Sequence, residues 1–327
     1  MRTIPFYPLV VLLLIGLGGY LGCDPNSVTL PLDGDLAPAV NSSSTASYSS
    51  TIPDRTNQTV LVGSFNLQRL GPTKLGNPWV MEKFAEIIRR FDVIALQEIT
   101  SVDQRTLPML VEQVNRLGAR YSYTISPRIG RDGTNGYFEQ YAFVFDTARI
   151  TGHAELCYVV EDQQDVMHRE PFVGRFETRS SQPFNFTLIN VHTDPDEIHE
   201  ELDVLAIVFQ NVRTFEYPED DIMLLGDLNA APGKLQALER IPGILPVIQG
   251  VPTNSRQNKT LDNILVDRQL TREFTGRAGV IDVAKMFQLQ LEDSERISDH
   301  LPIWAEFTIT EASGVPALAA GGNTTVR

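Results

Sequence analysis

The sequence predicts an α/β fold in which two packed β-sheets carry helices on their outer faces. Short apolar runs of strand length outnumber the amphipathic helical stretches, and helices lie between many of the predicted strands. Polar residues also recur at the ends of these strands. With 327 residues, 42% of them hydrophobic, the chain can bury a large core.

The first 22 residues are typical of an export signal. Arg2 is followed by an apolar run over 9–22 that is too short to span a bilayer comfortably. The run ends Tyr20-Leu21-Gly22-Cys23, which resembles a bacterial lipoprotein signal with Cys23 as the candidate lipidation site, although Tyr20 is bulkier than the usual first residue. An ordinary cleaved signal peptide and an uncleaved short anchor are the alternatives. We expect an exported protein, either a cell-envelope lipoprotein or a secreted one.

Composition sets the other boundaries. Residues 23–58 are rich in Ser, Thr, Asn, Pro and Asp and predict a flexible linker, and 311–327 predict a flexible tail. One globular domain is therefore expected at 59–310. If Cys23 is lipidated, Cys157 has no partner and is expected to be a buried thiol.

The first half of the domain alternates strands and helices. Apolar runs predict strands, and stretches with one apolar face predict helices. The predicted strands are 59–66, 92–98, 121–126 and the apolar end of 137–145, and the predicted helices are 78–91 and 103–117.

The second half repeats this rhythm. A strand at 184–191 leads to His192, and a helix with an apolar stripe is predicted at 197–215. Further strands are predicted at 222–225, 262–266 and 303–307. The acidic run 216–221 is interpreted as a solvated turn.

Polar side chains at the strand ends carry the chemistry. Each has a structural explanation as a turn or cap residue, but turn chemistry does not readily account for the whole set. The set is Asn66, Glu98, His192, Asp227, Asn229, Asp299 and His300. Oxygen ligands suit Mg²⁺, and histidines beside acids suit proton transfer. Asp227 and Asn229, two residues apart, point to one side, where the acid could orient a water and the amide could bind a phosphate oxygen.

The net charge limits the substrates. A formal charge of −14 argues against a general polyanion-binding surface. It still allows a nucleic-acid enzyme whose acidic cleft is neutralised by a divalent cation. Neither cysteine lies in a zinc-binding spacing.

The ordered motifs resemble the endonuclease/exonuclease/phosphatase superfamily, and within it the deoxyribonuclease I-like enzymes. The resemblance runs from about Val60 to Phe307 and implies a four-layer α/β sandwich of two central sheets flanked by helices. Its motifs are Ser64-Phe65-Asn66 with the downstream stretch from Gly71 to Asn77, Leu96-Gln97-Glu98, Asn135-Gly136-Tyr137-Phe138-Glu139-Gln140-Tyr141, Arg169-Glu170-Pro171, His192-Thr193-Asp194-Pro195, Gly226-Asp227-Leu228-Asn229, Asp262 and Ser298-Asp299-His300-Leu301-Pro302.

The resemblance also implies a role for each residue. Glu98, Asn66 and Asp299 are expected to hold Mg²⁺ or Mn²⁺. His192 is expected to pair with Glu139 and His300 with Asp262, while Asp227 orients water and Asn229 holds a phosphate oxygen. Asn135, Tyr137 and Arg169 are expected to contact the nucleic acid.

The implied enzyme is an exported, monomeric endonuclease. It would hydrolyse DNA, expected to be double-stranded, by in-line attack of water and leave 5′-phosphate ends. Membrane contact is expected only through a lipid anchor at Cys23. Gln68 and Thr100 stand where arginines are expected, which weakens the predicted duplex contact unless Arg69 and Arg105 compensate. Structural Ca²⁺ has only a partial site, at Asp165 and Glu170.

Two other functions compete with this prediction. One is a phosphodiesterase or phosphatase of the same superfamily acting on a phospholipid or phosphoinositide, because fold and catalytic centre are shared. The other is a catalytically dead binding protein, which the full set of catalytic residues opposes. Against a lipid substrate, no exposed apolar hairpin is evident near 128–136.

Overall fold

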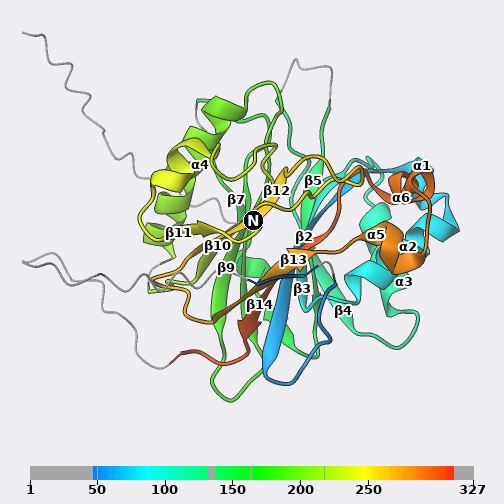
Figure 1. Ribbon diagram of the computed structural model, residues 1–327, viewed down its shortest axis with the longest axis horizontal. Coiled ribbons are helices and arrows are strands. Elements are labelled where there is room, and N and C mark those ends of the chain that lie inside the picture. Colours follow the sequence, from blue (N-terminus) through cyan, green and yellow to red (C-terminus); the bar gives the residue numbers. More distant parts are fainter. Residues whose placement is uncertain (1–46, 50, 132–136, 163, 217, 313–327) are drawn as a thin grey trace, which may run out of the picture. The chain divides into compact units, whose positions relative to one another are not determined.

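The computed structural model describes residues 47–49, 51–131, 137–162, 164–216 and 218–312. Two mixed β-sheets form the centre, and helices lie on both sides of them (Figure 1). The predicted four-layer α/β sandwich is confirmed. None of the helices within the described ranges could span a bilayer.

The first sheet has seven strands with mixed directions. In spatial order they are β1 (Ser47–Ser49), β13 (Phe274–Val280), β14 (Ile303–Thr308), β2 (Thr59–Leu70), β3 (Val93–Ile99), β5 (Gln140–Asp146) and β4 (Tyr121–Ile125). The pair β2–β3 runs parallel, so both strands end at the same edge of the sheet.

The second sheet also has seven strands. In order they are β11 (Ile244–Pro246), β12 (Asp262–Asp267), β10 (Ile222–Asp227), β9 (Asn185–His192), β8 (Phe172–Thr178) and β6 (Ile150–Gly152), with β7 (Tyr158–Val159) also paired to β8. The pair β9–β10 is parallel, and β12 runs antiparallel to β10.

The helices cover the outer faces of the sheets. They are α1 (Pro72–Leu75), α2 (Pro78–Ile88), α3 (Thr106–Asn115), α4 (Ile198–Phe215), α5 (Val283–Phe287) and α6 (Leu291–Ile297), with 3₁₀ turns at Ala154–Leu156 and Gln236–Arg240. In Figure 1, α4 lies on one side of the strands, and α2, α3, α5 and α6 lie on the other. Pro78 opens α2 at the predicted position, and the Asn77 side chain caps the helix by accepting a hydrogen bond from the Val80 N–H.

Alternation along each central strand builds two cores. Met223 and Leu225 of β10 pack between the sheets, while Ile222 and Leu224 pack under α4. A strand buried on both faces needs a continuous apolar run, which is why β10 is apolar from its first residue. The core between the sheets also holds a polar link, in which Gln97 Nε2 donates to Asn190 Oδ1 at 2.6 Å.

The described chain begins before the predicted domain boundary at 59. Strand β1, inside the predicted linker 23–58, pairs in parallel with β13. Arg55 Nη2 lies 2.6 Å from both Asp92 and Asp146, so the residues before β2 are also tied to the first sheet.

The acidic run 216–221 is not the solvated turn that was expected. Glu219 is 7% exposed and Asp221 is 1% exposed. Cys157 is free and half-buried, and burial raises the pKa of its thiol.

Candidate active site

Strand register brings three site residues into one row of the second sheet. Asp227 at the end of β10 pairs with His192 at the end of β9, because these strands are parallel. The antiparallel β12 starts at the same edge, so Asp262 pairs with Asp227 from the other side. The row His192, Asp227 and Asp262 therefore follows from backbone pairing.

The end of the first sheet adds Asn66 and Glu98. Asn66 Nδ2 donates to Asp227 Oδ2 at 3.0 Å, which links the two sheets inside the site. Glu98 stands at the end of β3 and its Oε2 accepts hydrogen bonds from the Arg69 N–H and the Tyr137 hydroxyl, both at 2.9 Å.

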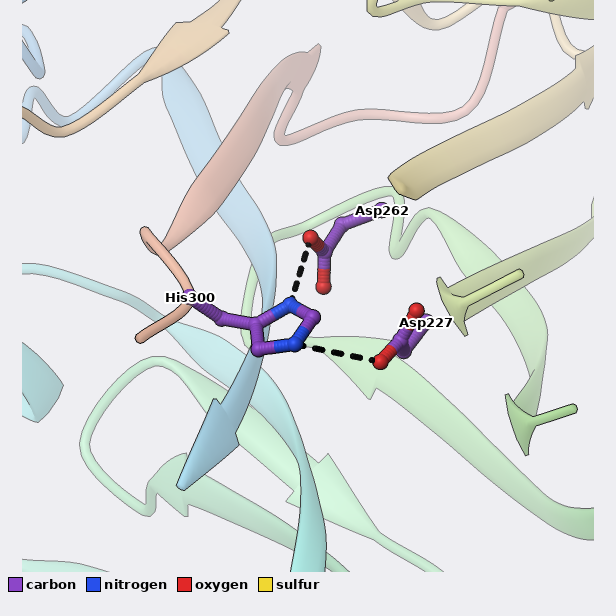
Figure 2. Close-up of side chains that lie close together, drawn as sticks. All are labelled: Asp227, Asp262 and His300. Atoms are coloured by element: carbon purple, nitrogen blue, oxygen red, sulfur yellow. Dashed lines mark hydrogen bonds and ion pairs between the residues drawn. The ribbon is translucent and has the colours of Figure 1, made fainter. Parts of the chain in front are cut away.

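Two histidine–carboxylate pairs flank Asp227. His192 Nδ1 lies 2.9 Å from Glu139 Oε1, and His300 Nδ1 lies 2.9 Å from Asp262 Oδ2. The Nε2 atoms of the two rings then point to one oxygen, Asp227 Oδ2, at 3.6 Å for His192 and 3.4 Å for His300. Figure 2 shows His300 between its two acids. Both predicted pairs are present.

Charge inside this buried cluster sets the protonation states. Burial alone would lower the pKa of His300, but Asp262 and Asp227 outweigh it and raise that pKa well above the ordinary value of 6.5. In the same way, Glu139 outweighs burial and raises the pKa of His192. The two imidazoles in turn hold the pKa of Asp227 below its ordinary value despite its burial.

Glu98 belongs to the same electrostatic cluster. Burial acts to raise its pKa, but the charge of His192 and the hydrogen bonds from Tyr137 and Asn66 lower it overall. Glu98 is therefore an ionised carboxylate. The Asn66 amide donates through Nδ2 to Asp227 and Glu98, and its Oδ1 accepts from the Gln68 N–H at 2.9 Å. The ionised carboxylate fits a hard divalent cation such as Mg²⁺.

Asp299 lies at the exposed rim of the site. Its side chain is exposed, and its backbone carbonyl accepts from the Ser255 N–H at 2.7 Å. Its negative charge acts to raise the pKa values of both His300 and Lys74. Its predicted role as a third metal ligand stays a prediction.

Asn229 and Arg169 are held by the backbone around His192. Asn229 Nδ2 donates to Thr193 O at 2.9 Å, and the Asn229 N–H donates to Asp227 Oδ1 at 3.0 Å. Arg169 Nε donates to His192 O at 3.0 Å, and one of its Nη atoms is buried without a hydrogen-bond partner among the described residues. Their phosphate contacts stay predictions.

Tyr137 lies at the rim, and Asn135 lies outside the described residues. The guanidinium of Arg69 stacks over the Tyr137 ring, with 5.4 Å from its carbon to the ring centroid. Arg69 is exposed, so it brings positive charge next to the position where Gln68 replaces the expected arginine. Arg105 instead is engaged by Asp103 at 3.0 Å on the surface.

Backbone strain gathers at this edge of the sheets. Gln68, Arg69, Glu98 and Asn229 all have φ between +48° and +61°, a left-handed conformation that is costly for residues with a Cβ atom. Gly226 has φ +147°, and a Cβ atom there would lie 1.9 Å from Val191 O. The close approach of β9 and β10 next to Asp227 therefore requires glycine.

Several supporting residues were not predicted from the sequence. The Tyr141 hydroxyl accepts from the His192 N–H at 2.9 Å, and Thr253 Oγ1 donates to Asp262 Oδ2 at 2.7 Å. Ser298 Oγ donates to Asn66 O at 2.8 Å and accepts from the His300 N–H at 3.0 Å. Lys74 Nζ donates to Leu67 O and Ile297 O, both at 2.7 Å. Lys74, Tyr141 and Ser298 lie within the quoted motifs, although no role was predicted for them, whereas nothing in the sequence marks Thr253.

Known proteins match this chain over the residues that build the site. The Endonuclease/Exonuclease/phosphatase family matches residues 63–300. Human Deoxyribonuclease-1-like 1 is 31% identical over 274 residues, covering 80% of this chain and 89% of that protein. Deoxyribonuclease gamma of Rattus norvegicus is 31% identical over 257 residues, covering 73% of this chain and 82% of that protein.

Solved structures show the same fold at low sequence identity. Truncated Caenorhabditis elegans TDP2 aligns with a TM-score of 0.52 and 15% identity, covering 76% of this chain and 98% of that one. The human Nocturnin catalytic domain with bound sulfate aligns with a TM-score of 0.52 and 15% identity, covering 77% and 95%. Together with the sequence matches, these findings make the chain a deoxyribonuclease I-like member of the endonuclease/exonuclease/phosphatase family.

Proposed function

We propose that this phosphodiester hydrolase is a divalent-metal-dependent endonuclease acting on DNA. One observation carries the proposal: two imidazoles, each held by its own carboxylate, point to the same oxygen of Asp227 at 3.4 and 3.6 Å. A phosphodiester transition state gains negative charge on several oxygens at once, and donors on both sides of the attacking group stabilise that charge.

The chain's own residues divide the chemistry. Asp227 is the acceptor for the proton of an attacking water, since its carboxylate is ionised between the imidazoles. One imidazole donates a proton to the leaving 3′-oxygen, and the other stabilises the phosphate charge. The free hydrogen of the Asn229 amide reaches a non-bridging oxygen. The two serines of the motifs, Ser64 and Ser298, are buried and hydrogen-bonded to neighbouring residues, and the motifs contain no Cys. Water is therefore the attacking group, and its in-line attack leaves a 5′-phosphate.

Glu98 would hold the cation, with Asp299 at the rim, and Asn66 would join them through the amide oxygen that accepts from the Gln68 N–H. Family enzymes generally depend on a divalent metal, and the oxygen donors here suit Mg²⁺ or Mn²⁺. When bound, the metal supplies Lewis-acid stabilisation of phosphate charge. Tyr137 and Arg69 orient Glu98 through its Oε2, so the exposed rim and the cation site share one hydrogen-bonded unit.

DNA as the substrate is supported by two features. Relatives with about 31% identity are named deoxyribonucleases. The exposed Arg69, stacked on the half-buried Tyr137, offers a cation next to the site, as expected for contact with a nucleic-acid backbone.

Plasmid nicking tests the proposal. The purified chain should convert supercoiled plasmid to open circles with Mg²⁺ or Mn²⁺ and not with EDTA. His192→Ala should reduce the rate by about 10²-fold or more. His153→Ala, a histidine outside the site, is the matched control. Turnover of sphingomyelin or inositol phosphates without plasmid nicking would replace DNA by a lipid or inositol substrate.

Export is the second part of the proposal. The predicted signal and Cys23 lie outside the described residues, so the proposal rests on the sequence alone. In a bacterial host, the wild-type chain should fractionate with membranes and Cys23→Ser should not. An unchanged distribution in this variant would contradict lipidation at Cys23.

A further inference from the structure

A second carboxylate cluster lies at the opposite end of the strands from the active site. Asp221 immediately precedes β10, whose other end carries Asp227, which places the cluster about 20 Å from the site. Glu273 precedes β13 and Glu311 follows β14. One ligand oxygen from each of Asp221, Glu273 and Glu311 lies within 4.8 Å of the other two. The cluster therefore joins the second sheet to the first.

Two oxygens in this cluster are buried without a partner. Asp221 is 1% exposed and Glu273 is 2% exposed, and neither Asp221 Oδ1 nor Glu273 Oε2 has a hydrogen-bond partner among the described residues. Two of the other four oxygens accept hydrogen bonds: Glu273 Oε1 from the Ala312 N–H at 2.6 Å, and Glu311 Oε2 from the Asn185 N–H at 3.3 Å. Burying a carboxylate oxygen without a hydrogen-bond partner destabilises the folded state, so a ligand at these two oxygens is expected.

Neighbouring charges increase the demand for a positive ligand. Glu219 and Asp220 form a second group with Asp221 within the same 4.8 Å limit. Two arginines lie near this second group. Arg175 Nη2 lies 3.7 Å from Glu219, and the charge of Arg272 acts to lower the pKa of Asp220. In the chain without a bound cation, burial and the surrounding carboxylates raise the pKa of Asp221 to about 10. A proton and a cation are thus the two candidate occupants.

The donor set favours calcium among the cations. All the ligand atoms are oxygens, whereas zinc sites are built mainly from cysteine and histidine. Ca²⁺ binds oxygens at about 2.3–2.6 Å and tolerates irregular geometry, so two of its ligands can stand up to about 4.8 Å apart. Mg²⁺ needs a tighter octahedron and releases its waters reluctantly.

We propose that Asp221, Glu273 and Glu311 bind a structural Ca²⁺ ion that clamps the two sheets together at the end opposite the active site. The ion would take the two orphaned oxygens and one oxygen of Glu311, with backbone carbonyls or waters completing its shell. This site is separate from Glu98 and Asn66 and does not depend on the proposed nuclease activity.

Calcium-dependent stability of the full chain tests the site. After EDTA treatment and dialysis, melting temperatures are measured with Ca²⁺, with Mg²⁺ and with neither. Binding at a concentration a hundredfold above Kd should raise the melting temperature by about 5–10 °C. Calorimetric titration with Ca²⁺ counts the sites per chain.

Variants assign the effect to this cluster. Glu273→Gln and the half-buried Glu311→Gln should each lose one calcium site and the melting shift. Glu98→Gln and Asp165→Asn change the other candidate cation sites. They should keep the calcium site at Asp221, Glu273 and Glu311 and the melting shift that it causes. Asp221→Asn distinguishes a bound proton from a bound cation. If this variant is as stable as the wild type both in EDTA and in Ca²⁺, a proton occupies the cluster and the proposal is overturned. A melting shift that persists in Glu273→Gln and Glu311→Gln would also overturn it.

Discussion

Replacing Asp262 by asparagine isolates the charge that Asp262 places on His300. The amide keeps the size of the side chain, and its oxygen in the place of Oδ2 can still accept from both His300 Nδ1 and Thr253 Oγ1. What is lost is a negative charge 2.9 Å from the ring nitrogen in a site where His300 is only 8% exposed.

The magnitude follows from the geometry. Two unit charges centred about 4 Å apart interact by about 4 kcal/mol at an effective dielectric constant of about 20, which corresponds to about three pKa units. Asp227 remains 3.4 Å from His300 Nε2, so the pKa of His300 should fall toward its ordinary value without passing far below it. The imidazolium then disappears at a lower pH than in the wild type.

The assay is the initial rate of plasmid nicking between pH 6 and pH 8.5. We expect Asp262→Asn to lose about 10²–10⁴-fold in kcat/KM, with a larger deficit at pH 8 than at pH 6 because the protonated ring is lost first at high pH. Asp54→Asn, an exposed carboxylate, is the matched control, and thermal melts confirm folding. A deficit below tenfold, or one that is the same at every pH, would refute the role assigned to this pair.

Three further predictions concern the metal, the backbone and a buried lysine. Glu98→Gln should raise the Mg²⁺ concentration needed for half-maximal nicking by about 10- to 100-fold, and an unchanged requirement would remove Glu98 from the cation site. Gly226→Ala should lower the free energy of unfolding by about 2–5 kcal/mol in urea denaturation, because its Cβ atom would meet Val191 O at 1.9 Å; a loss below 1 kcal/mol would contradict this packing. Burial lowers the pKa of Lys74 to about 8, so the folded chain binds fewer protons than the unfolded chain up to about pH 10.5. The contribution of Lys74 to unfolding free energy should therefore rise from pH 8 to 10.5, and Lys74→Met should flatten that part of the curve, whereas equal slopes would contradict the shift.

Strongly periodic segments could be predicted from the sequence. The strands that became β2, β3, β9 and β10 and the helix α4 are long, apolar or clearly amphipathic, and they lie within a few residues of the expected positions. Strand β13, with the sequence FTGRAGV, was missed because only its last residues are fully buried and it contains two glycines. The short helices α5 and α6 have too few turns for a periodic signal.

The composition of the site was predictable, but its geometry was not. Residue types at strand ends identified the catalytic candidates, whereas their meeting depends on register and on the packing of one sheet against the other. The hydrogen bond from Asn66 to Asp227 joins residues 161 positions apart. Local patterns also failed for Asp221, because tertiary packing buries an acidic run that is polar enough for a surface turn.

A double-mutant cycle tests the shared site most directly. His192→Ala, His300→Ala and the double variant are compared with the wild type by plasmid nicking at saturating Mg²⁺. If both imidazoles act through Asp227 on one phosphate, the double variant should be only slightly slower than the slower single variant, because either loss already disables the unit. Losses that multiply would show that the two histidines act independently and would contradict the convergence on Asp227.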